Sequence, residues 1–160
     1  MISPELLRRY PFFGGLDDAQ LKALAMIADD LDFDAGTTLF ESDEAATGLY
    51  LLMAGSVELY YVVGDPADPG LRKEFYASDI NLGEIVGISA LVEPHRYTST
   101  ARVVSPSRVL KLDAAALRAL CEVDARLAVS LLRQTAKTAK QRLHDTRVQL
   151  IASRLQLQGA

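Results

Sequence analysis

Apolar positions change their spacing twice along the chain, and these changes divide it into three regions. In residues 1–30 they recur at helical intervals. Residues 31–112 instead contain short apolar runs, such as TTLF, GLYLLMAG and STARVV, separated by Gly, Asp and Pro. In residues 113–160 the helical spacing returns. The pattern predicts N-terminal helices, a β core and C-terminal helices, in that order.

The central region also shows the two-residue alternation of strands that bury one face. Val57, Leu59 and Tyr61 alternate with Glu58 and Tyr60. The connector GDPADPG that follows is rich in turn-forming residues, which predicts a hairpin between SVELYYVV and LRKEFYA. Many short strands separated by frequent turns indicate a sandwich or barrel. The predicted fold class is therefore α+β, with a β core between two helical ends.

The third region is expected to contain two helices, the first capped by Asp113 and the second starting near Asp124. Apolar side chains recur every seven residues in the second helix, at Ala136, Leu143, Leu150 and Leu157. A helix of about 30 residues extends roughly 45 Å, which is more than a domain of this size covers easily. We favour a parallel two-helix homodimer along this seam. A helix folded back along the barrel is the alternative.

The composition is that of one soluble globular domain. The chain has 160 residues, of which 49% are hydrophobic and 24% charged, enough for a sizeable core. No apolar run approaches the roughly 20 residues of a membrane span, and the start MISPELLRRYPFF is too polar for a secretion signal. Cys121 is the single cysteine, so no internal disulfide can form. We expect a cytoplasmic protein without a membrane partner, and a buried position for Cys121.

The net charge of −4 hides an asymmetry between the last helix and the rest of the chain. From Arg126 onward there are seven Lys or Arg residues and one acid, Asp145. The last helix therefore carries about +6 and the remainder about −10. We interpret this charge run as a solvated helix face docked on an acidic body. A surface for an acidic partner or for nucleic acid is the alternative.

The segment LGEIVGISALVEPHRYTSTARV, residues 82–103, has the residue types of a nucleotide site. Its glycines let a ligand approach the backbone, and GEIVGISAL could begin a short helix whose amides attract an anion. Arg96 offers a planar donor fork for phosphate oxygens, and Glu84 can accept hydrogen bonds from sugar hydroxyls. The set suits a ligand with a phosphate and a ribose. Glu84 and Arg96 could equally form a structural ion pair.

Four stretches resemble the cyclic nucleotide-binding domain, the sensor module of the catabolite activator protein family and of cyclic-nucleotide-regulated kinases and channels. PFFGGLDDAQLKALA resembles its N-terminal helical lead-in, and AGTTLFESDEAATGLYLLMAGSVELY its early strands. SDINLGEIVGISAL followed by RYTSTA resembles its phosphate-binding cassette, and RVLKLDAAALRAL its closing strand and the next helix. The resemblance implies an antiparallel jelly-roll barrel, the β-roll of this family, with cAMP or cGMP as its ligand.

The resemblance also implies which residues bind that ligand. The predicted set is Gly83, Glu84, Ile85, Arg96, Tyr97, Thr98, Ser99 and Arg142. Glu84 would accept the ribose 2′-hydroxyl, framed by backbone groups of its two neighbours. Arg96 would pair with the cyclic phosphate, assisted by a hydroxyl or amide from the residues after it. Arg142, or Thr138 one turn earlier on the long helix, would reach the base.

Two departures from the family pattern leave alternatives open. Gly87 stands one place late, and Tyr97 intervenes between Arg96 and the following strand. Arg96 could therefore point away from the phosphate, and His95, Arg96 and Tyr97 could form a different pocket or a protein contact. The module would then bind another small effector, or act as an interaction scaffold without a ligand.

Other function classes find little support. The chain has no nucleophile elbow and no phosphate-loop fingerprint, so we do not expect an enzyme. His95 and His144 lie far apart without a cluster of Cys or carboxylates, so neither a metal nor a cofactor is expected. No helix-turn-helix pattern follows the long helix, so DNA binding is not expected either. The predicted function is a stand-alone regulatory sensor that signals through its long helix to a dimer mate or a protein partner.

Overall fold

A computed structural model of the chain describes residues 2–65 and 67–159. A small helical unit comes first: α1 (Pro4–Arg8), the 3₁₀ turn η1 (Pro11–Phe13) and α2 (Asp18–Met26). The sequence starts α2 with a capping box. The side chain of Asp17 accepts from the amide of Gln20 at 2.8 Å, and the Gln20 side chain accepts from the amide of Asp17 at 3.0 Å. The helical lead-in indicated by the sequence is therefore present.

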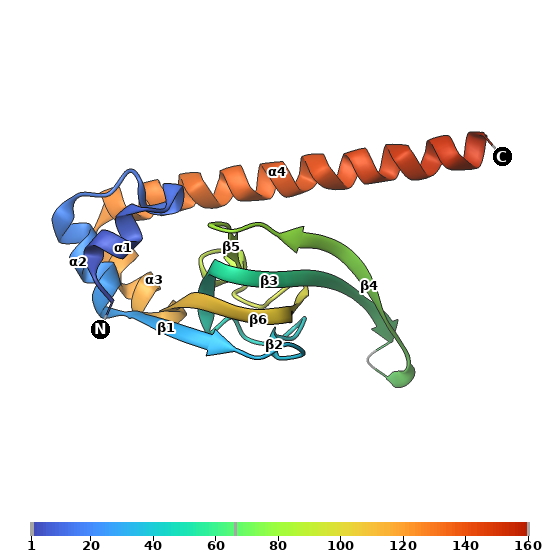
Figure 1. The fold of residues 1–160 in the computed structure, drawn as a ribbon, viewed down its shortest axis with the longest axis horizontal. Helices are drawn as coiled ribbons and strands as arrows, with labels where there is room; N and C mark the ends of the chain where they lie inside the picture. Colours follow the sequence, from blue (N-terminus) through green and yellow to red (C-terminus); the bar gives the residue numbers. More distant parts are fainter. Residues whose placement is uncertain (1, 66, 160) are drawn as a thin grey trace.

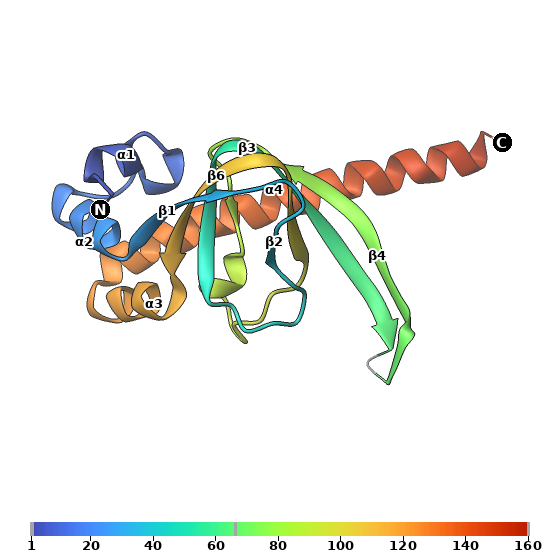
Figure 2. The same cartoon turned by 60° about the horizontal axis from the view of Figure 1, so that its bottom comes forward.

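The β region forms one six-stranded sheet. Its strands are β1 (Ala28–Phe33), β2 (Thr38–Phe40), β3 (Gly48–Asp65), β4 (Asp68–Ile80), β5 (Ile85–Val86) and β6 (Thr100–Asp113). The order is β1-β6-β3-β4, with β2 beside β6 and β5 beside β3, and every pairing is antiparallel. Figures 1 and 2 show these strands curving into a roll. This confirms the predicted α+β fold with an antiparallel β-roll.

The first strand begins inside the range expected to be helical. β1 starts at Ala28, which lies opposite Leu112 of β6. Its outward-facing Asp30 accepts a hydrogen bond from Arg108 of β6 at 2.9 Å. The helical spacing of apolar residues continues into Ala28 at the start of the strand, so spacing alone placed the boundary too late.

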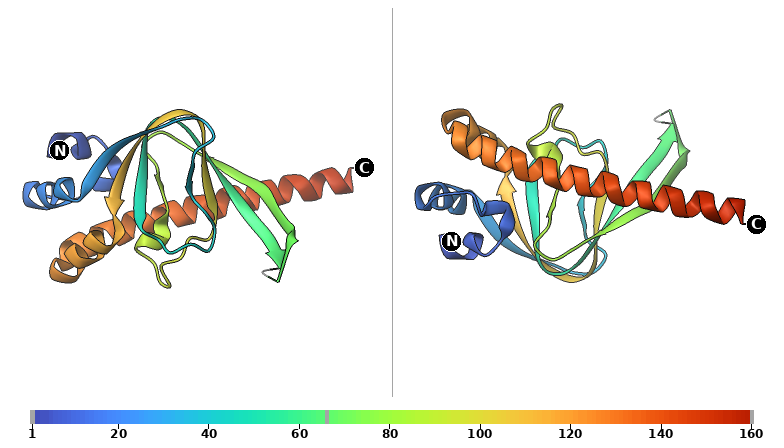
Figure 3. Two further views of the ribbon diagram at one scale, coloured as in Figure 1. Left: turned by 90° about the horizontal axis from the view of Figure 1, so that it is seen from below. Right: turned by 90° about the horizontal axis from the view of Figure 1, so that it is seen from above.

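β3 and β4 form a long hairpin whose outer half leaves the roll, as Figures 1 and 3 show. The two strands have 18 and 13 residues. The predicted hairpin is confirmed, but most of its expected GDPADPG connector is strand, because β3 ends at Asp65 and β4 begins at Asp68. The outer half exposes aromatic residues, with Tyr61 directly opposite Phe75. The inner half belongs to the roll, where the inward-facing Val57, Leu59 and Ile80 are buried.

One continuous hydrophobic core joins the roll to the helices at both ends. β3 and β6 contribute Leu49, Leu52, Leu110 and Leu112, all fully buried. The N-terminal unit adds Leu7, Phe13, Leu21 and Leu24, and the C-terminal helices add Leu117, Leu127 and Leu131. Cys121, expected to be buried, is half-buried at the margin of this core, and its burial raises the pKa of the thiol. The helical unit, the roll and the start of the C-terminal helices therefore pack as one body.

The two C-terminal helices are α3 (Ala114–Val123) and α4 (Ala125–Gln158). Asp113 caps α3 as predicted, and Asp124, near which the second helix was expected to start, caps α4; their carboxylates accept hydrogen bonds from helix amides at 2.9 and 3.0 Å. α4 has 34 residues, which is about 50 Å at 1.5 Å per residue. It lies across the roll and then extends past it (Figures 1 and 3). Within the described residues, no helix is both long enough and apolar enough to cross a membrane.

Candidate ligand-binding cavity

A cavity of about 440 Å³ lies between the roll and α4. Its volume is in the range of small-molecule sites. The roll supplies most of its lining: Phe40, Leu59, Tyr61, Ala77, Ser78, Asp79, Asn81, Glu84, Val86, Gly87, Ile88, Ser89, Tyr97, Thr98 and Ser99. α4 supplies the remaining wall: Ala139, Arg142, Leu143, Asp145, Thr146 and Gln149. A molecule in this cavity would therefore contact the roll and α4 together.

Glu84 is held at the cavity wall by a fixed loop. The amide of Gly83, at a φ of 84°, donates to the carbonyl of Leu52 at 2.8 Å, and the Leu52 amide donates to the Glu84 carbonyl at 3.1 Å. One carboxylate oxygen of Glu84 accepts from the amide of Asn81 at 2.8 Å. The other has no hydrogen-bond partner among the described residues. Glu84 therefore retains an acceptor for a ligand hydroxyl.

Tyr97 and Phe40 line the cavity with two stacked aromatic rings, whose centroids are 3.8 Å apart. The buried Tyr97 hydroxyl donates to the carbonyl of Gly48 at 2.7 Å and accepts from the Gly48 amide at 3.0 Å. Burial raises the pKa of the Tyr97 phenol. Because its hydroxyl is already bonded twice, Tyr97 contributes its nearly buried ring to the cavity wall, not the polar contact expected from the sequence.

Arg96 does not line the cavity, in contrast to the expected contact with a phosphate. Its Nε donates to the Asp43 carboxylate at 3.1 Å, its Nη2 donates to the Asp43 carbonyl, and the side chain is half-exposed. Backbone bonds explain this direction: the amide of Asp43 donates to the Tyr97 carbonyl at 2.8 Å, and the amide of Tyr97 donates to the Glu44 carbonyl at 2.9 Å. Neighbouring side chains of an extended segment point to opposite sides. Burying Tyr97 therefore turns Arg96 outward.

Arg142 reaches the cavity from α4, as the sequence predicted. Its guanidinium donates to the carbonyl of Ile85 in β5. Burial lowers the pKa of Arg142, and the nearby charge of Glu84 opposes that shift. Thr138, the alternative on the same helix, instead donates its hydroxyl to the carbonyl of Gln134 at 3.1 Å and does not line the cavity.

The short helix expected in GEIVGISAL is only a 3₁₀ turn, η2 (Ile88–Ala90). Gly87 precedes it with a φ of 86°, and an added Cβ there would lie 3.1 Å from both the Gly48 carbonyl and the Tyr97 ring. This close approach explains a glycine at that place. A single turn of three residues has little of the macrodipole expected of a longer helix.

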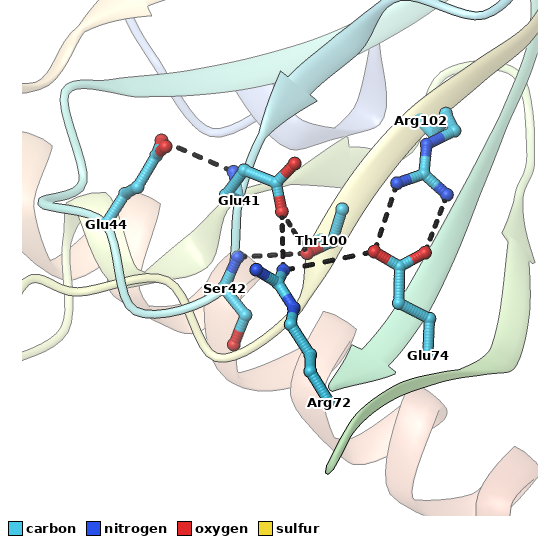
Figure 4. Close-up of polar contacts among 7 residues, drawn as sticks. All are labelled: Glu41, Ser42, Glu44, Arg72, Glu74, Thr100 and Arg102. Carbon is cyan, nitrogen blue, oxygen red and sulfur yellow. Dashed lines mark hydrogen bonds and ion pairs between the residues drawn. The ribbon is translucent and has the colours of Figure 1, made fainter. Parts of the chain in front are cut away.

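A polar network beside the cavity ties the end of β2 to β4 and β6 (Figure 4). Arg72 of β4 lies 3.0 Å from the Glu41 carboxylate, and Arg102 of β6 donates to Glu74 at 2.9 and 3.2 Å. These bonds hold the pKa of Glu74 below its usual range. The buried Thr100 hydroxyl donates to Glu41 at 3.2 Å. The network fixes the hairpin against the strand that begins just after Thr98 and Ser99.

The structure thus brings together only part of the predicted set. Glu84, Tyr97, Thr98, Ser99 and Arg142 line the cavity, Gly83 and Ile85 support it through the backbone, and Arg96 lies outside. Phe40, the residues at the end of β4 and the other α4 residues of the lining were not predicted. Leu143 was assigned to the dimer seam, and the helical repeat gave no sign that it also faces a cavity.

The basic residues of α4 form a separate surface. Arg126, Arg133, Lys137 and Lys140 line an open groove of about 800 Å³ along the first half of the helix. Within the described part of the chain none of them forms an ion pair. The run is therefore a solvated face, but ion pairs do not dock it on the acidic body. The described residues also contain no cluster of His, Cys, Asp and Glu that could hold a metal.

Comparison with known proteins places this architecture in a family. The model of the cyclic nucleotide-binding domain matches residues 31–124, which is more than half of the chain. The chain therefore belongs to the cyclic nucleotide-binding domain family, as the sequence resemblance indicated. The matched range contains most of the roll, α3 and the cavity wall around Glu84.

Individual relatives agree with this assignment. A crystal structure from Geobacter metallireducens GS-15, provisionally named as a cyclic nucleotide-binding protein, shares 37% identity and a TM-score of 0.78, over 90% of this chain and 100% of that chain. The CRP-like cAMP-activated global transcriptional regulator of Mycobacterium tuberculosis is 26% identical over 133 residues, 83% of this chain. The matched part spans 57% of that regulator. The sensor domain of the transcriptional regulator DNR from Pseudomonas aeruginosa has 23% identity and a TM-score of 0.67, over 88% of this chain and 95% of that chain, so it shares the fold.

Proposed function

We propose that this chain is a non-catalytic regulatory module that senses a cyclic nucleotide, cAMP or cGMP, in the cavity under α4. The observation that carries the proposal is the two-sided lining of that cavity. The roll presents Glu84 and α4 presents Arg142, and the Arg142 guanidinium already bonds to the Ile85 carbonyl of the roll. A ligand there would change the contacts between the two parts. The family and its cAMP-activated relative support the ligand class.

The chemistry of the lining supports a nucleoside-like ligand. The free oxygen of Glu84 can accept a bond from a ribose hydroxyl, and Thr98 and Ser99 offer hydroxyl or amide donors at the same wall. The stacked, nearly buried rings of Phe40 and Tyr97 form an apolar part of the same wall. A cytoplasmic location, where cyclic nucleotides act as messengers, belongs to the same proposal.

Isothermal titration with cAMP and with cGMP tests the proposal. We expect saturable binding that Glu84→Ala weakens, because the replacement removes the free acceptor. Glu93→Ala, at an exposed position outside the cavity, is the matched control and should bind as the wild type does. Absence of both heat and thermal stabilisation at millimolar nucleotide would exclude the proposed ligand class.

We further propose that the response passes along α4 to a homodimer mate. Leu143, Leu150 and Leu157 repeat every seven residues on one face and are 50%, 50% and 79% exposed. Apolar side chains that are this exposed at heptad spacing favour a helix–helix contact. This seam also supports the alternative role, a dimerisation or protein-interaction scaffold that needs no ligand.

Analytical ultracentrifugation tests the dimer. Leu150→Lys should shift the protein to a monomer, because it places a charge at the centre of the seam. Val148→Lys is the control, because Val148 is equally exposed at 53% but lies on another face of α4. A wild-type protein that stays monomeric at high concentration would contradict the seam. Dimerisation without any nucleotide binding would favour the scaffold.

A further inference from the structure

The residue expected to bind the anionic group of a ligand does not line the cavity. Arg96, the residue expected there, is turned outward to Asp43. Resting on the proposed sensor function, we infer that the anionic group of the ligand pairs with Arg142 of α4, and that the cavity selects a ligand with a single negative charge.

The charged residues of the cavity lining identify Arg142 as the partner of an anionic group. Among the described residues that line the cavity, Arg142 is the one cationic side chain. Three lining residues are acids: Asp79, Glu84 and Asp145. Asp79 and Asp145 are exposed and accept bonds from Tyr76 and Gln141, at 2.8 and 2.9 Å. Glu84 is the acid that stands deeper in the wall.

Arg142 also has hydrogen-bonding capacity to spare. A guanidinium carries five N–H donors, and Arg142 uses its Nη2 group on the Ile85 carbonyl. Within the described residues its guanidinium forms no other hydrogen bond and no ion pair. Arg72, Arg96 and Arg102, by contrast, each have a carboxylate partner. The remaining Arg142 donors are free to hold two oxygens of a phosphodiester side by side.

The energetics favour an anion at this place. Partial burial of a cation that has no ion-pair partner is unfavourable; burial lowers the pKa of Arg142, and the nearby charge of Glu84 offsets this only in part. A monoanion would restore the balance. A second negative charge would meet Asp79, Glu84 and Asp145 without another cation in the lining. A cyclic phosphodiester, with one charge, should therefore bind better than a phosphomonoester, which carries about −1.5 to −2 at neutral pH.

If Arg142 binds the anionic group, the ligand contacts α4, the helix proposed to carry the signal, directly. In the cavity wall, Glu84 belongs to the roll and Arg142 belongs to α4. A ligand bonded to both would bridge them, so the anion would stabilise α4 in its position across the roll. A neutral nucleoside would fill the same space without that bridge.

Isothermal titration of the wild type, Arg142→Gln and Arg96→Gln with cAMP, 5′-AMP and adenosine tests the inference, with the guanine series in parallel. The wild type should bind the cyclic diester more tightly than the monoester. Arg142→Gln should weaken the cyclic diester about tenfold to a hundredfold, the range for hydrogen bonds to a charged group. It should leave the affinity for the nucleoside unchanged. Arg96→Gln should match the wild type for all ligands.

Two controls keep the result interpretable. Melting temperatures of the variants verify the fold, and Arg142→Lys, which keeps the charge but loses the planar fork, should bind the cyclic diester with intermediate affinity. Loss of cyclic diester binding in Arg96→Gln but not in Arg142→Gln would overturn the anchor. Equal or tighter binding of the monoester would overturn the single-charge selection. A wild type that binds neither the diesters nor the nucleosides would contradict the proposed function itself.

Discussion

Tyr97→Phe should destabilise the protein through two hydrogen bonds, although it removes a single oxygen atom. The hydroxyl lies between the amide and the carbonyl of Gly48, at 3.0 and 2.7 Å, and Tyr97 is only 3% exposed. The substitution keeps the ring and therefore its stacking on Phe40, 3.8 Å away. What changes is the pairing of two backbone groups at the start of β3.

The expected magnitude follows from those two groups. A buried donor or acceptor left unsatisfied costs about 1–3 kcal/mol. Because relaxation can restore part of the pairing, we expect a loss of about 2–3 kcal/mol in the free energy of unfolding. At about 2–4 °C per kcal/mol for a chain of this size, the melting temperature should fall by about 4–12 °C.

Urea unfolding and calorimetry measure this loss, with Tyr61→Phe as the matched control. Tyr61 lines the same cavity, but it is 57% exposed and its hydroxyl bonds to no described residue. Its replacement should change the free energy of unfolding by less than about 0.5 kcal/mol. If both variants unfold at the wild-type urea concentration, the Tyr97 hydroxyl does not hold β3 as described.

Three further predictions concern the scaffold. Gly55→Ala should cost at least about 2 kcal/mol in urea unfolding, because its Cβ would lie 2.2 Å from the Ser107 hydroxyl at a φ of +94°; Gly36→Ala, with a φ of +89° and open space around it, should cost less. Asp124→Ala should lower the melting temperature by a few degrees at pH 7 through loss of the α4 cap. Hydrogen bonds, chiefly from a helix amide, lower the pKa of Asp124, so the difference from wild type should shrink as acid protonates the cap, and a constant difference would contradict this. Burial raises the pKa of Tyr50 to about 12, so stability should fall between pH 10 and 12 as the unfolded chain ionises first, and Tyr50→Phe should reduce that fall.

Local sequence signals predicted the parts of the fold that depend on neighbouring residues. Asp113 identified the start of α3, because a carboxylate that caps a helix acts within three residues. The alternation around Leu59 identified a strand and the turn-rich connector GDPADPG identified the hairpin, because these signals are also local. The start of β1 was missed, because Ala28 fits a helical spacing as well as a strand and only its partner Leu112 on β6 decides between them.

The site was harder to predict because its residues come from distant elements. The place of Glu84 at the site was predicted from its motif. The direction of the Arg96 side chain, in contrast, depends on its bond to Asp43, which lies more than fifty residues away in the sequence. The role of Leu143 at the cavity edge depends on how α4 crosses the roll. Contacts of this kind arise from tertiary packing, and spacing along one helix does not reveal them.

The central claim is that a nucleotide occupies the cavity between the roll and α4 and contacts both. Amide chemical shifts of the isotopically labelled protein, followed by NMR during titration with cAMP and cGMP, test it most directly. The largest changes should fall on Glu84, on Thr98 and Ser99, and on α4 around Arg142. Changes confined to the surroundings of Asp43 and Arg96, or none at millimolar nucleotide, would contradict it.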